Sequence, residues 1–212
     1  MTQPAIEGLY AITPDIGDTA TLISMIQQSL AGGARLIQYR NKTASAALRL
    51  EQAHSLAGLC RQFHVPLIIN DHLDLAIEIN ADGVHLGTED ATIIEARRKL
   101  GDKKIVGASC YNRLEHALEA EREGADYVAF GAFFASATKP RAVAASMDLL
   151  RHARKILRGP IVAIGGVTPS TAVELIQAGA DAVAVSNGLF GVPNIQRAAE
   201  RLAGFFKPKP GS

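Results

Sequence analysis

Short apolar segments alternate with amphipathic segments along the whole chain. The apolar segments are almost continuous in apolar character, which is typical of parallel strands that are covered on both faces. Eight of them are predicted as strands, at residues 9–12, 35–39, 67–70, 83–86, 105–108, 127–130, 161–164 and 182–185. The segments between them have helical spacing. The pattern therefore predicts repeated strand–helix units.

Helix faces and helix ends support this prediction. Leu22, Ile26 and Leu30 fall on one face of the first helical segment. Thr168-Pro169 is expected to open the helix that includes Leu175, with Thr as the N-cap and Pro in the first helical position. Glycines follow several helical patterns where a left-handed cap is needed, namely Gly32-Gly33, Gly101, Gly124 and Gly179.

A junction of the type Gly-Ala before a strand recurs at residues 31–34, 123–126 and 178–181. Such repetition favours an α/β fold of the (β/α)8 TIM-barrel type. A doubly wound open sheet is the alternative, but the chain lacks its early Gly-rich fingerprint. At 212 residues the barrel must be compact. We expect one domain over residues 1–212, with a frayed, flexible tail at 207–212.

Composition limits the class of protein. Hydrophobic residues make up 48% and charged residues 20%, and the formal net charge is +1. These values indicate a soluble globular protein without an electrostatic footprint for nucleic acid or a membrane surface. The chain has no apolar stretch of membrane-spanning length and its start is unlike a signal peptide, so we expect a cytoplasmic protein. Cys60 and Cys110 have no metal or redox spacing. The sequence is compatible with both a monomer and a homo-oligomer.

Two carboxylates follow neighbouring predicted strands. Asp71 ends the third strand and Asp90 follows the fourth. In a barrel the carboxyl ends of the strands share one rim, so the two side chains are expected to lie close together. Paired oxygen ligands suit Mg²⁺, which also takes substrate phosphates. Either residue alone could be a helix cap or a surface ion-pair partner, but the two together favour a metal site.

Cations are expected at the same rim. Arg40 and Lys42 follow the second strand and suit phosphate recognition, although a solvated charged loop explains them equally well. Lys139 lies beside Ser136 and Thr138, which suggests a second anion-binding loop. An ordinary Ser/Thr turn is the alternative there.

Glycine-containing loops follow the last two strands, at residues 165–168 and 185–188. Loops in these positions commonly hold phosphate in barrels of this type. Ser109 ends the fifth strand and could donate to a ligand, without a nucleophile-elbow pattern around it. His85 and His72 are interpreted as structural histidines.

Several short motifs occur together in one order. They are Gln38 to Lys42, Ile69-Asn70-Asp71, Gly83 to Gly87 with Asp90, Ser136-x-Thr138-Lys139, Ala163 to Val167, and Val185-Ser186. In these motifs the chain resembles the thiamine-phosphate synthase family from Gly8 to Phe190. The resemblance implies a Mg²⁺-dependent transferase that joins 4-amino-2-methyl-5-hydroxymethylpyrimidine diphosphate to thiazole phosphate, or its carboxylated form. The products would be thiamine phosphate and pyrophosphate, formed by a dissociative mechanism.

The resemblance also implies roles for individual residues. Asp71 and Asp90 would hold Mg²⁺, and Arg40, Lys42 and Lys139 would stabilise charge on the leaving group. The pyrimidine diphosphate would contact Gln38, Tyr39, Arg40, Asn41, Lys42, Asn70, Ser109 and Lys139. The thiazole phosphate would contact Ser136, Ala137, Thr138, Gly166, Val185 and Ser186.

The chain departs from the family pattern at two places. Ala135-Ser136-Ala137-Thr138 replaces a Pro-Thr-x-Thr loop, and Thr88 stands where many members carry Gln. Two other functions remain as alternatives. A thiazole tautomerase on the same fold would need a proton-shuttling base rather than the full pyrophosphate set. A non-catalytic phosphate-binding barrel would need neither metal carboxylate.

Overall fold

The computed structural model describes residues 5–134 and 144–206, and within them eight parallel strands form a closed barrel. Each strand pairs with its neighbours in sequence, and β8 returns to pair with β1. The strands are β1 (Gly8–Ile12), β2 (Leu36–Tyr39), β3 (Leu67–Asn70), β4 (Gly83–Leu86), β5 (Ile105–Tyr111), β6 (Tyr127–Phe130), β7 (Ile161–Ile164) and β8 (Ala182–Val185). The predicted (β/α)8 architecture is confirmed.

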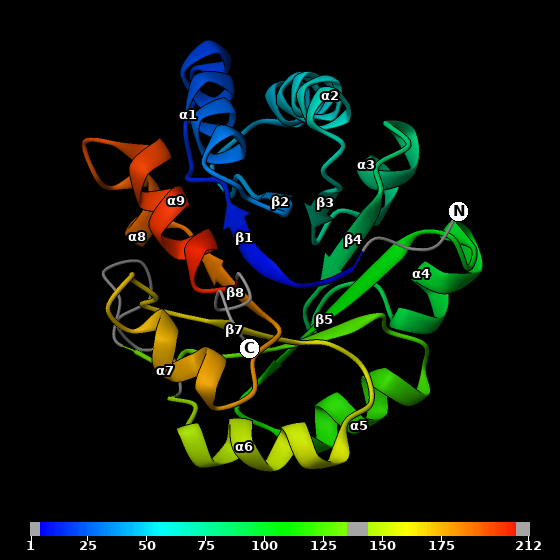
Figure 1. Cartoon of the computed structure of the whole chain (residues 1–212). Coiled ribbons are helices and arrows are strands. Elements are labelled where there is room, and N and C mark those ends of the chain that lie inside the picture. Colours follow the sequence, from blue (N-terminus) through cyan, green and yellow to red (C-terminus); the bar gives the residue numbers. More distant parts are fainter. Residues whose placement is uncertain (1–4, 135–143, 207–212) are drawn as a thin grey trace.

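Helices surround the strands in sequence order (Figure 1). They are α1 (Thr19–Ala31), α2 (Ala46–Phe63), α3 (Leu73–Glu78), α4 (Ile93–Leu100), α5 (Leu114–Arg122), α6 (Met147–Ile156), α7 (Ala172–Gln177), α8 (Asn187–Phe190) and α9 (Ile195–Gly204). The last helix, α9, packs against α1 and so closes the outer ring. No helix in the described ranges is both long enough and apolar enough to cross a membrane.

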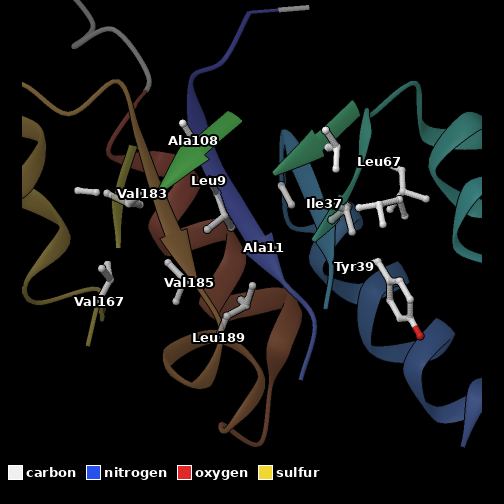
Figure 2. Close-up of a cluster of buried hydrophobic side chains, with 14 of the residues drawn as sticks. Leu9, Ala11, Ile37, Tyr39, Leu67, Ala108, Val167, Val183, Val185 and Leu189 are labelled. Atoms are coloured by element: carbon white, nitrogen blue, oxygen red, sulfur yellow. The ribbon is translucent and has the colours of Figure 1, made fainter. Parts of the chain in front are cut away.

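Alternation along each strand divides the core into two clusters. Residues such as Leu9, Ala11 and Ile37 point outward and pack against the helices, in the larger cluster of which Figure 2 shows a part. Their neighbours Tyr10 and Leu36 point inward and fill the barrel together with side chains of the other strands. This period of two decides which strand residues can reach the interior.

The interior has room for large rings because some inward positions are glycine. A Cβ added to Gly107 on β5 would run into the ring of Tyr127 on β6. Tyr127 is fully buried and forms an edge-to-face pair with Tyr10, at 6.0 Å between ring centroids. The absence of a side chain at Gly107 therefore leaves the space that the ring of Tyr127 occupies inside the barrel.

The predicted helix ends are mostly confirmed. Gly33, Gly101, Gly124 and Gly179 all have positive φ at the ends of helices. The prediction for Thr168-Pro169 is wrong in detail, because α7 begins at Ala172. Thr168 instead opens a turn, in which its carbonyl accepts from the Ala172 N–H at 3.0 Å and its N–H donates to Thr171 Oγ1. The predicted tail at 207–212 lies outside the described residues.

Candidate active site

A pocket of about 540 Å³ opens at the carboxyl ends of the strands. Its walls come from all eight strands, β1 to β8, and from several of the loops that follow them. Residues expected at the site that line it are Gln38, Arg40, Asn70, Ser109, Gly166, Val185 and Ser186. The structure thus brings residues of both expected substrate sites to one cavity.

The loop after β2 is held by residues that follow β1. Thr13 Oγ1 donates to the Arg40 carbonyl at 2.7 Å and accepts from the Arg40 N–H at 2.8 Å. Asp15 Oδ1 accepts from the Lys42 backbone N–H at 3.0 Å and lies 3.4 Å from an Arg40 guanidinium nitrogen. These contacts fix the path of the loop, so that Arg40 faces the pocket.

Two residues in this segment have side chains engaged elsewhere. The Tyr39 hydroxyl donates to Gln52 Oε1 on α2 at 2.8 Å, on the outer side of the barrel (Figure 2). The Asn41 amide nitrogen donates to Gln52 and to the Ile16 carbonyl, and its oxygen accepts from the loop backbone at Ala44. The structure does not bring the side chains of Tyr39 and Asn41 to the pocket.

Asp71 and Asp90 lie beside each other at the ends of β3 and β4, but neither is among the residues that line the pocket, and Asp71 lines a second hollow between α2 and α3. Burial, the charge of Asp90 and a hydrogen bond between the two side chains raise the pKa of Asp71, while Lys42 opposes the rise. Lys42 Nζ is 3.9 Å from Asp71 Oδ2. Asp90 Oδ2 also accepts from the Gly87 N–H at 2.7 Å. A like-charge pair with one cation beside it is a site prepared for added positive charge.

The backbone at Asp71 has an uncommon conformation. Its φ is +62°, in the left-handed region that non-glycine residues rarely adopt. The Asp71 N–H donates to the His85 carbonyl at 2.9 Å, which extends the β3–β4 pairing by one residue. This pairing holds the carboxylate at the strand end. Among the described residues, no group of three or more His, Cys, Asp or Glu could hold a metal ion together.

The loops after β7 and β8 line the same pocket as Arg40. Gly165 and Gly166 have φ of +103° and +63°, and a Cβ on Gly165 would run into Ala132. A Cβ on Gly188 would run into the Val167 carbonyl oxygen, so the two loops pack backbone to backbone. Val185 points its side chain outward into the helix layer, and its backbone lines the pocket.

Hydrogen bonds link polar side chains across the interior below the pocket. Gln38 Nε2 donates to the Tyr10 hydroxyl at 3.0 Å, which lies 2.8 Å from the Tyr127 hydroxyl. That hydroxyl lies 2.9 Å from His85 Nδ1, and His85 Nε2 lies 2.8 Å from Ser109 Oγ. Burial lowers the pKa of His85 to about 4 and raises the pKa values of Tyr10 and Tyr127. The three titratable members of this hydrogen-bond chain, Tyr10, Tyr127 and His85, are therefore neutral at physiological pH.

The sequence predicted some parts of this site and missed others. Ser136, Ala137, Thr138 and Lys139 lie outside the described residues. Asp15 was missed, although it follows a strand in the same manner as the predicted residues. Tyr10 and Tyr127 were missed too, and their only sequence signal is a hydroxyl at an inward strand position.

A parallel eight-stranded barrel with its polar groups at the carboxyl ends of the strands has the architecture of a (β/α)8 enzyme. The family profile described as thiamine monophosphate synthase matches residues 9–189. The chain belongs to this family, and it is a transferase of thiamine biosynthesis.

Individual proteins agree with this assignment. The thiamine-phosphate synthase of Nitrosospira multiformis is 63% identical over 95% of this chain and 86% of its own length. That of Nitrosomonas eutropha is 53% identical over 97% of both chains. The solved structure of thiamine phosphate pyrophosphorylase from Pyrococcus furiosus superposes with a TM-score of 0.82, at 34% identity, over 94% of this chain and 95% of its own.

Proposed function

We propose that the protein condenses 4-amino-2-methyl-5-hydroxymethylpyrimidine diphosphate with thiazole phosphate, or its carboxylated form, to give thiamine phosphate and pyrophosphate. One observation carries this proposal: a single pocket has the Arg40 side on one wall and the glycine loops after β7 and β8 on the other. Family membership supports the same reaction. The two walls suit two phosphorylated substrates bound side by side.

Asp71 and Asp90 are the residues that would hold Mg²⁺. Their fit rests on the adjacent carboxylates and on the raised pKa of Asp71, which a divalent cation would reverse. Mg²⁺ commonly uses one or two carboxylates together with substrate phosphates and water, so a two-carboxylate site suffices. When bound, the ion would neutralise charge on the diphosphate oxygens.

Arg40 and Lys42 bind and stabilise the diphosphate. Arg40 presents a planar guanidinium that can donate two parallel hydrogen bonds, and its side chain is 19% exposed. Lys42 is 56% exposed and can move from Asp71 to a substrate phosphate. Lys139 completes this set by resemblance, together with the pyrimidine contacts of Gln38, Asn70 and Ser109. Tyr39 and Asn41 are proposed to act through the loop that they hold.

The reaction begins with dissociation of the pyrimidine diphosphate into a pyrimidine methylene cation and pyrophosphate. The bond between the pyrimidine methylene carbon and the diphosphate oxygen breaks, and its electron pair leaves with pyrophosphate. The electron-rich aminopyrimidine ring stabilises the methylene cation, and the thiazole nitrogen then donates its lone pair to that carbon. Protein residues act by orienting both partners and by stabilising the departing charge. Gly166, Val185 and Ser186, with Ser136, Ala137 and Thr138, would hold the thiazole phosphate.

A tautomerase function receives no support from the interior histidine. His85 has both ring nitrogens in hydrogen bonds and a pKa lowered to about 4, so it is poorly matched to a proton-shuttling base near neutral pH. We place the synthase in the cytoplasm, where its buried free cysteines, Cys60 and Cys110, would stay reduced.

The direct test is product formation. The protein is incubated with both substrates and Mg²⁺, and thiamine phosphate and pyrophosphate are measured. Both products should form in equal amounts and only when both substrates are present. Asp71→Asn should form much less product. Asp74→Asn is its matched control, because Asp74 is a 93% exposed carboxylate three residues further on, paired with Lys99. Product without Mg²⁺, or none with it, would contradict the proposal.

A further inference from the structure

The hydrogen-bond chain from Gln38 to Ser109 crosses the interior of the barrel. Its members come from β1, β2, β4, β5 and β6, and all of them point inward. Gln38, Tyr10, His85 and Ser109 line the pocket, whereas Tyr127 is not among its lining residues. The hydrogen-bond chain therefore connects its two ends, Gln38 and Ser109, through two buried hydroxyls and the imidazole of His85.

The direction of this chain follows from counting hydrogens. In the orientation of the Gln38 amide that the structure has, its nitrogen faces Tyr10 and can only donate, so the Tyr10 oxygen accepts. The Tyr10 hydrogen then goes to Tyr127, which is its remaining hydrogen-bond partner in the described structure. The Tyr127 hydrogen in turn goes to His85 Nδ1.

His85 then has one possible tautomer. Its ring nitrogens contact two hydroxyls and no carboxylate, and a buried imidazolium without a paired charge would be costly. With Nδ1 as the acceptor, the neutral ring carries its hydrogen on Nε2, which donates to Ser109 Oγ. The Ser109 hydrogen is left to point into the pocket.

With this orientation of the Gln38 amide, the opposite direction leaves a buried donor unpaired. If Ser109 donated to His85, each later hydrogen would turn around, and Tyr10 would receive hydrogens from both Gln38 and Tyr127. The Tyr10 hydrogen would then have no partner among the described residues, at a position that is 1% exposed. An unsatisfied buried donor is costly enough to decide between the two directions.

We propose that Tyr10, Tyr127 and His85 are positioning residues that fix Ser109 as a hydrogen-bond donor toward the pocket. The pocket would accordingly select a heteroaromatic ring that turns an unprotonated nitrogen toward Ser109. An aminopyrimidine meets this requirement, whereas a ring with an N–H at that position would place two donors against each other. The inference rests on the proposed function for the identity of the ring, and on the hydrogen bonds alone for the direction.

A double-mutant cycle tests whether Tyr127 acts through Ser109. Binding of the pyrimidine diphosphate and of thiazole phosphate is titrated for the wild type, Tyr127→Phe, Ser109→Ala and the double variant. Tyr127→Phe should weaken pyrimidine diphosphate binding about 2- to 10-fold, as expected for one misdirected hydrogen bond. It should have no further effect in the Ser109→Ala background, and thiazole phosphate binding should not change.

Ser29→Ala is the control for losing a buried hydroxyl. Ser29 is fully buried on α1, where its Oγ donates to the Ile26 carbonyl, away from the pocket. It should leave both titrations unchanged. Equal weakening by Tyr127→Phe with and without Ser109, or equal weakening of both ligands, would show a merely structural role and overturn the proposal.

The tautomer itself gives a second readout. ¹⁵N NMR of the histidine rings, with the His85 signals identified by their loss in His85→Gln, should show the hydrogen on Nε2 in the wild type. Tyr127→Phe should shift it partly to Nδ1. A wild-type hydrogen on Nδ1 would overturn the proposed direction. If the protein formed no thiamine phosphate but kept the Nε2 hydrogen, the proposed function would fail while the direction of the chain stood.

Discussion

Replacing Asp71 with asparagine should make the protein more stable and much less active. Asparagine keeps the size of the side chain and tolerates a φ of +62° well, so the backbone need not change. Its amide can donate to Asp90 where the carboxylate could only do so when protonated. The substitution therefore removes one negative charge and little else.

The sign of the stability change follows from the pKa. Burial and Asp90 raise the pKa of Asp71 in the folded state, so its ionised form is disfavoured there relative to the unfolded chain. The contribution of Asp71 to the free energy of unfolding is then most favourable when Asp71 is protonated. It falls as pH rises from the unfolded pKa of about 3.9 through the folded value, and the deficit persists at neutral pH. Asparagine abolishes this deficit.

The size of the change can be bounded from the charges. Two like charges about 4 Å apart repel by about 4 kcal/mol at an effective dielectric constant of 20, and by about 1 kcal/mol in water. Lys42, 3.9 Å from Asp71 but 56% exposed, returns less than about 1 kcal/mol. After discounting for solvent, we expect a gain on the order of 1 kcal/mol, or about 2–4 °C in Tm for a chain of this length.

Thermal unfolding without metal, and with Mg²⁺ plus inorganic pyrophosphate, checks this reasoning. The wild type should gain about 2.7 kcal/mol when the ligands are present at 100 times their Kd, whereas Asp71→Asn should respond little. Turnover of the variant should fall on the order of 100- to 1,000-fold. Asp74→Asn should behave as the wild type in every measurement.

Two results would refute the assignment of Asp71. One is a lower Tm of Asp71→Asn than of the wild type in metal-free buffer, because the like-charge repulsion would then be absent. The other is an unchanged response to Mg²⁺ and pyrophosphate, because the ion would then be held elsewhere.

Three further changes test separate parts of the structure. Gly166→Val puts a branched side chain at a φ of +63° on the pocket wall, so it should weaken thiazole phosphate binding selectively; equal loss for both substrates in separate titrations would contradict the two-wall arrangement. Lys139→Ala should lower kcat on the order of 100- to 1,000-fold with little change in apparent affinity, and steady-state kinetics would disprove this by showing a change in KM alone. Gly107→Ala pushes against the ring of Tyr127 and should cost about 1–3 kcal/mol of stability in urea unfolding, a prediction that unchanged stability would disprove.

The barrel could be predicted because its rules are local and repetitive. Apolar segments of strand length marked β3, β4, β6, β7 and β8 at their observed bounds. The longer β5 was missed because its last residues depend on pairing with β6, and the later start of α7 was missed because Thr168 opens a local turn before the helix. In β5 the register shifts between Ser109 and Tyr111, and no local pattern marks such a bulge.

The candidate site could be predicted where polar residues directly follow a strand, because such residues lie at the carboxyl-end rim of the barrel. Asp71, Asp90 and Arg40 follow strands, and parallel strands end at one rim. The rule does not say which side chains turn away, as Tyr39 does toward Gln52. Period-two alternation supplies part of that answer, because an inward Gln38 leaves its neighbour outward.

The interior hydrogen-bond chain was beyond such rules for a physical reason. Tyr10 and Tyr127 are 117 residues apart, and their hydroxyls meet only because the barrel closes and Gly107 leaves room for the second ring. Alternation assigns both to the interior, but the pairing of two hydroxyls depends on register and depth across several strands. Contacts of this kind are a property of the closed barrel.

Two residues with unfavourable local features lie where the chemistry is proposed. Asp71 combines a left-handed backbone with a carboxylate pressed against another carboxylate, and Tyr111 at the pocket edge has a φ of +52°. Strain of this kind persists only where the surrounding structure imposes it, and it is common at functional sites. Here the closed barrel and the β3–β4 pairing impose it at Asp71. The like-charge pair that lowers stability is the same feature that would hold the proposed divalent cation, so substitutions that stabilise this rim are expected to cost activity.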